Sequence, residues 1–85
     1  MAELPFRDLK REMDEACQFL HLFTLGRRGF TRRDILAGIA RVGGLCDQMK
    51  EGFESGPHAK DAADSITSAR KQIEAAEARL ALLPG

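Results

Sequence analysis

Three stripes of apolar residues at helical spacing constrain the fold of this chain more than any other feature. Within each stripe the apolar residues recur at alternating steps of three and four, so they fall on one side of an α-helix. Short glycine-containing breaks at residues 26–30 and 55–57 separate the three segments. Because short connections place consecutive helices antiparallel, we expect an all-α, antiparallel three-helix bundle with helices at about 5–25, 31–53 and 57–83.

The residues of the stripes form the predicted core. In chain order they are Phe6, Leu9, Met13, Ala16, Leu20 and Phe23, then Ile35, Ile39, Val42, Cys46, Met49 and Phe53, and then Ala59, Ala62, Ile66, Ala69, Ile73, Ala76, Leu80 and Leu83. Half of the third stripe is alanine. The third helix can therefore lie close to its neighbours while it buries little area per turn.

Several residues mark the predicted helix ends. Pro5 suits the first turn of a helix, and Gly26 suits the position just past the end of one. Thr31 and Asp34 have the spacing of a capping box, with Phe30 before the cap as a hydrophobic staple.

The second predicted helix contains three glycines. Gly38, Gly43 and Gly44 each weaken a helix by about 1 kcal/mol relative to alanine. We expect a neighbouring backbone to approach closely at these positions and to offset that loss.

Composition limits the class of protein. A chain of 85 residues fits a single helical domain spanning 1–85, and 44% hydrophobic residues argue against disorder. The net charge is zero, which argues against a general nucleic-acid binder. We expect no signal peptide, because the first residues lack a basic start followed by an apolar stretch, and no apolar run approaches the roughly 18 residues that a membrane span needs. With two cysteines we expect a reducing compartment, and so a cytoplasmic protein.

The chain offers little for catalysis. Cys17 and His21 lie four residues apart on one helix side, where a histidine could activate a thiol. A metal site would lack ligands, because tetrahedral zinc takes four from closely spaced pairs. The glycines also fit no phosphate-binding loop. We therefore expect no enzyme, no metal and no cofactor.

Positive charge is concentrated at the first break. The segment of residues 26–33, called the elbow below, contains no acid and four arginines: Arg27, Arg28, Arg32 and Arg33. The arginine guanidinium can form two parallel hydrogen bonds to a carboxylate or phosphate group, and a helix N-terminus attracts anions. These arginines could pair with Asp34 or with acids of another chain, dock an acidic protein, or bind a nucleotide or nucleic acid.

A second apolar face precedes the elbow. Phe19, Leu22 and Leu25 point away from the first stripe and either pack under the third helix or form an exposed interface. Together with regular seven-residue spacing on long helices, this face favours a homo-oligomer. The sequence thus predicts a protein–protein interaction module, an adaptor, inhibitor or accessory subunit, that self-associates and docks an acidic partner through the elbow. The alternative is a binder of phosphate-bearing ligands that uses the same arginines.

Overall fold

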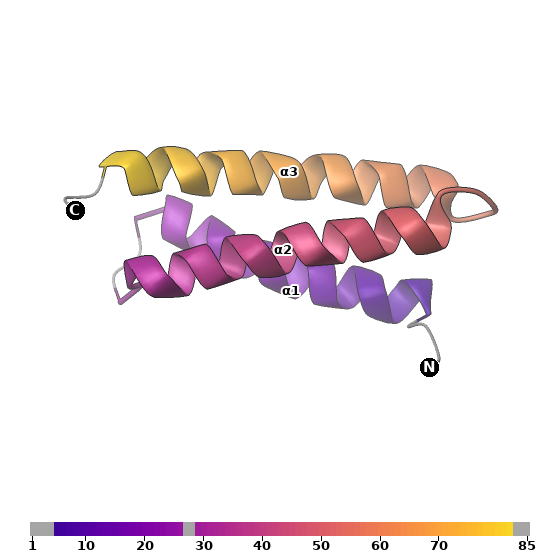
Figure 1. The fold of residues 1–85 in the computed structure, drawn as a ribbon, viewed down its shortest axis with the longest axis horizontal. Helices are drawn as coiled ribbons and strands as arrows, with labels where there is room; N and C mark the ends of the chain where they lie inside the picture. The colour runs from indigo at the N-terminus through magenta and orange to yellow at the C-terminus, as the bar shows by residue number, and fades with distance from the viewer. Residues whose placement is uncertain (1–4, 27–28, 83–85) are drawn as a thin grey trace.

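The chain forms a bundle of three helices that all contact one another. The computed structural model describes residues 5–26 and 29–82, with α1 at Phe6–Thr24, α2 at Arg32–Phe53 and α3 at Ala59–Leu82. Figure 1 shows the helices side by side along the long axis of the molecule, which measures 44 × 24 × 17 Å. The described ranges contain no strand. The predicted all-α three-helix bundle is confirmed, and each helix begins and ends within two residues of its predicted bounds.

Contacts at the two ends of the bundle fix how the helices lie against one another. At one end the ring of Phe6 meets Phe53 edge-on at 5.0 Å and stacks on His58 at 4.5 Å between centroids. The start of α1 therefore lies beside the end of α2 and the start of α3. At the other end, the guanidinium of Arg79 lies against Gly26. The end of α1 is thus close to the end of α3, and the elbow leads from there into α2 (Figure 1).

The core is built from the predicted stripes. All six residues of the first stripe are buried, as are Ile35, Val42, Cys46 and Met49 of the second. In α3, alanines at every seventh position are the most buried residues, namely Ala62, Ala69 and Ala76. Within the described chain, no polar or charged residue is buried. The bundle is therefore held together by apolar contact, with α3 lying close to its neighbours because its buried side chains are small.

A few stripe positions differ from the expected burial. Ile39, Phe53, Ile66 and Ile73 are half-buried and pack against the edge of the core, and Ala59 at the start of α3 is also half-buried. Leu45, which lies off the stripe, is buried. Leu83 lies outside the described residues. Two helices contact α2 at once, so its buried face is wider than a single stripe and includes Leu45 beside Cys46.

The predicted caps are present. The amide of Asp34 donates to Oγ1 of Thr31 at 3.1 Å, and the amide of Thr31 donates to Oδ2 of Asp34 at 3.4 Å, which completes the capping box. Gly26 follows the last turn of α1 with φ of +85°, a conformation that glycine adopts without strain. The elbow is thus set by local sequence on both sides.

The explanation expected for the three helix glycines is wrong in two ways. At Gly38 the close neighbour is a side chain, because a Cβ there would lie 2.9 Å from the ring of Phe19 and 3.2 Å from Leu20. At Gly43 and Gly44 a Cβ would meet nothing within 4 Å. Both glycines lie on the side of α2 that faces away from α1 and α3, so no part of the described chain offsets their effect on the helix.

Alanine substitutions should separate these glycines. Gly44→Ala should raise the free energy of unfolding by about 1 kcal/mol, because it improves helix propensity in open space. Gly38→Ala makes the same change of residue but forces the Phe19 ring to move, so it should be clearly less stable than Gly44→Ala. Urea unfolding followed by circular dichroism at low chain concentration measures both. Equal gains in the two variants would contradict the packing of Phe19 on Gly38.

Candidate binding surface

Two of the four elbow arginines belong to the described residues, and both lie at the start of α2. Arg32 and Arg33 occupy its first turn and are exposed. Neither forms an ion pair with any acid in the described ranges, where salt bridges join residues of α1 alone. Asp34 forms no ion pair with either arginine, and its carboxylate accepts from the Thr31 amide in the capping box. Arg27 and Arg28 lie outside the described residues.

Exposed leucines surround this region. The large apolar side chains that stay exposed in the described chain are Leu25, Leu36 and Leu82, at 62%, 52% and 81% exposure. Leu25 caps the end of α1, Leu36 lies in the second turn of α2, and Leu82 ends α3. All three therefore lie at the same end of the bundle as Arg32 and Arg33 (Figure 1). We call this end, with Leu25, Arg32, Arg33, Leu36, Arg79 and Leu82, the elbow end.

The structure separates the three residues of the predicted apolar interface. Phe19 is half-buried within the molecule, where its ring meets Phe30 edge-on at 5.0 Å and covers Gly38. Leu22 is half-buried, and Leu25 is exposed. Of the three, only Leu25 therefore offers most of its side chain to another molecule.

Sequence reasoning missed three members of the elbow end. Leu36 directly follows Ile35 and lies off the apolar stripe, so its exposure could have been predicted from the sequence. Arg79 and Leu82 belong to this end only because the bundle brings the end of α3 beside the elbow. That proximity depends on tertiary structure.

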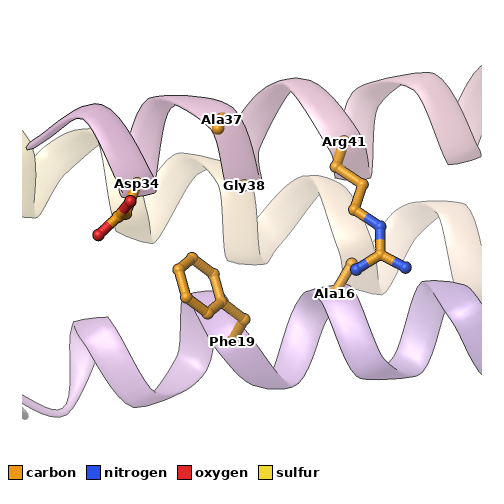
Figure 2. A pocket seen from close by; sticks show the side chains of 6 residues that line it. All are labelled: Ala16, Phe19, Asp34, Ala37, Gly38 and Arg41. Atoms are coloured by element: carbon orange, nitrogen blue, oxygen red, sulfur yellow. The ribbon is translucent and has the colours of Figure 1, made fainter. Parts of the chain in front are cut away.

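A groove opens between α1 and α2 near the elbow end (Figure 2). It has a volume of about 280 Å³ and an apolar lining of Ala16, Phe19, Ala37 and Gly38. Figure 2 shows the ring of Phe19 pointing from α1 toward α2, between Asp34 on one side and Arg41 on the other. Its mainly apolar lining suits contact with an apolar side chain of another molecule.

Cys17 and His21 do line one hollow, together with Asp14, Gln18 and Gln72. Burial raises the pKa of the Cys17 thiol, and the nearby Cys46 and Asp14 raise it further. A nucleophilic cysteine needs the opposite shift, since the thiolate is the reactive form. Cys46 is buried, and burial also raises the pKa of its thiol. Both cysteines are free thiols.

Within residues 5–26 and 29–82, no three His, Cys, Asp or Glu side chains are grouped so as to hold a metal ion.

Comparison with known proteins adds no relative. No protein-family model, no curated protein and no solved structure matches the chain. In the part of the chain that the structure describes, no helix is both long enough and apolar enough to cross a bilayer.

The raised thiol pKa values predict slow alkylation. At neutral pH, iodoacetamide should modify Cys17 and Cys46 of the folded protein more slowly than those of the urea-unfolded chain, because less thiolate is present. The unfolded chain also loses these thiol protons at lower pH than the folded protein. The free energy of unfolding should therefore fall as the pH rises above the ordinary thiol pKa. Mass spectrometry of timed samples measures the rates, and faster alkylation of folded Cys17 would indicate an activated thiol.

Proposed function

We propose that this protein is a non-enzymatic protein–protein interaction module that self-associates and docks an acidic partner at the elbow end. One observation carries the proposal: the exposed leucines of the described chain gather at the end where Arg32 and Arg33 have no acidic partner. Apolar side chains beside cations suit an acidic protein surface with apolar residues of its own. The role fits an adaptor, an inhibitor or an accessory subunit.

The two kinds of side chain have different tasks in this mechanism. Exposed cations raise the rate of encounter with an acidic surface and orient it, because their field extends over about a Debye length. Leu25 and Leu82 then bury apolar area against the partner and slow its release. Affinity thus depends on both, whereas the dependence on salt comes from the arginines.

The capping box favours a protein partner over a phosphate group. A helix N-terminus binds phosphate through free backbone amides. At the start of α2 the amides of Thr31 and Asp34 already donate within the capping box, and the Asp34 carboxylate lies where a phosphate would approach. An acidic protein surface can reach the exposed guanidinium groups without displacing that carboxylate.

Reversal of the elbow charges tests the proposal. With Arg27, Arg28, Arg32 and Arg33 all changed to Glu, the fold should persist, since Arg32 and Arg33 are exposed and form no ion pair within the described chain. A pull-down from native cells with mass spectrometry identifies the partner. Calorimetry with that purified partner should then show affinity reduced by about a hundredfold or more.

A matched variant controls for net charge. Arg7, Lys50, Lys60 and Lys71 lie away from the elbow end, and changing these four to Glu alters the net charge equally. This variant should keep the affinity of the natural chain, whereas Leu25→Ser with Leu82→Ser should speed dissociation. Unchanged affinity after reversal of the elbow would disprove the mechanism. A rise in melting temperature with oligonucleotides or nucleotides, lost in the elbow variant, would favour the phosphate-binding alternative.

A further inference from the structure

The outer face of α2 has no partner within the described chain. At 3.6 residues per turn, eight residues lie within about 60° of Ala40, on the side opposite the buried Met49. They are Arg33, Leu36, Ala37, Ala40, Gly43, Gly44, Asp47 and Glu51. All are exposed except Gly43, which is half-buried. Four of the eight are alanine or glycine, so another helix could approach this face closely.

Two observations make this face unusual for a surface that meets water alone, and its two charged ends are unpaired. Gly43 and Gly44 weaken the helix, and a Cβ at either position would lie in open space. Leu36 is 52% exposed. Arg33 and Asp47 form no ion pair with described residues.

The outer face of α2 is complementary to the same face of a second, antiparallel copy of α2. Arg33 and Asp47 each lie seven residues from Ala40, on opposite sides of it. Leu36 and Gly44 each lie four residues away, so a large apolar residue matches a glycine. In a two-fold symmetric pair, each residue meets the counterpart at the same distance from the axis. Two antiparallel copies of α2 crossing at Ala40 would therefore match cation with anion and leucine with glycine.

We infer that the outer face of α2 binds a second copy of this chain, antiparallel and with its two-fold axis at Ala40. The guanidinium of Arg33 pairs with the Asp47 carboxylate of the second copy, and the reverse pair forms about 21 Å away along the helices. Leu36 packs over Gly44 of the second copy. Glycine is needed there because any larger side chain would hold the helices apart.

A second copy fits this face better than the acidic partner does. Asp47 and Glu51 both lie on the outward side of α2, where they would repel an acidic surface. Within seven residues of Ala40 the face carries one cation, Arg33, and one anion, Asp47, at equal distances from its centre, so two antiparallel copies place opposite charges against each other.

This pairing rests on the self-association in the proposed function, and it divides the elbow end between two partners. Arg33 and Leu36 face the second copy, which leaves Leu25, Arg32, Arg79 and Leu82 for the acidic partner. The two α2 N-termini lie about 24 Å apart along the crossing helices and point in opposite directions. The dimer therefore presents two docking ends, and a partner with two acidic sites would gain affinity through avidity.

A charge swap tests the pairing. Sedimentation equilibrium of the natural chain should show a monomer–dimer equilibrium at concentrations up to about 1 mM. Asp47→Arg should raise the dissociation constant of the dimer by about tenfold, because two ion pairs become two repulsions. Arg33→Glu should do the same. The double variant restores opposite charges across the axis and should return the dissociation constant to near that of the natural chain.

Two alanine positions provide a matched control. Ala40→Glu places two carboxylates at the axis and should abolish the dimer, whereas Ala78→Glu, at an exposed position of α3, should not. Circular dichroism shows that each variant is folded. A natural chain that dimerises but is unaffected by Ala40→Glu and Asp47→Arg would overturn the interface and leave self-association intact. A natural chain that stays monomeric would overturn both the interface and self-association, and it would leave the proposed docking of the acidic partner untested by this experiment and open to the charge-reversal test above.

Discussion

The whole structure depends on burying three apolar stripes that no helix can bury alone. A helix on its own is only marginally stable in water, and in a protein most of its stability comes from packing of an apolar face. The helices α1, α2 and α3 each have one such face. Three helices around a shared axis bury all three faces at once. Because the described core contains no polar or charged side chain, every charged group lies outside it.

The three helices contribute unequally to this core. Large side chains come mainly from α1, where Phe6, Met13, Leu20 and Phe23 are buried. The buried positions of α3 are mostly alanine, so α3 adds little area and instead approaches closely. Gly38 plays a comparable part in α2, where the ring of Phe19 lies against the helix. Small residues thus set the distances between helices, and large residues supply most of the buried area.

The fold could be predicted because its determinants are local. Apolar spacing gave the helices, and Pro5, Gly26, Thr31 and Asp34 marked their ends. The elbow was also visible as four arginines without an acid. What failed depends on contacts between distant residues: Leu45 is buried because α2 has two neighbours, and Phe19 turns inward because Gly38 leaves room. The place of Arg79 and Leu82 beside the elbow likewise arises from packing of α3 and has no local signal.

The surfaces proposed for docking therefore lie outside the core that stabilises the molecule. The contacts that hold the helices together are apolar and internal, whereas the elbow end and the outer face of α2 contribute little to the core. Native-state hydrogen exchange measures this separation most directly, because it reports the opening free energy of each backbone amide. Central amides of α1, α2 and α3 should share one opening free energy, equal to that of global unfolding. Exchange of α3 amides at the rate of an unfolded peptide, while α1 and α2 stay protected, would contradict a single core of three stripes.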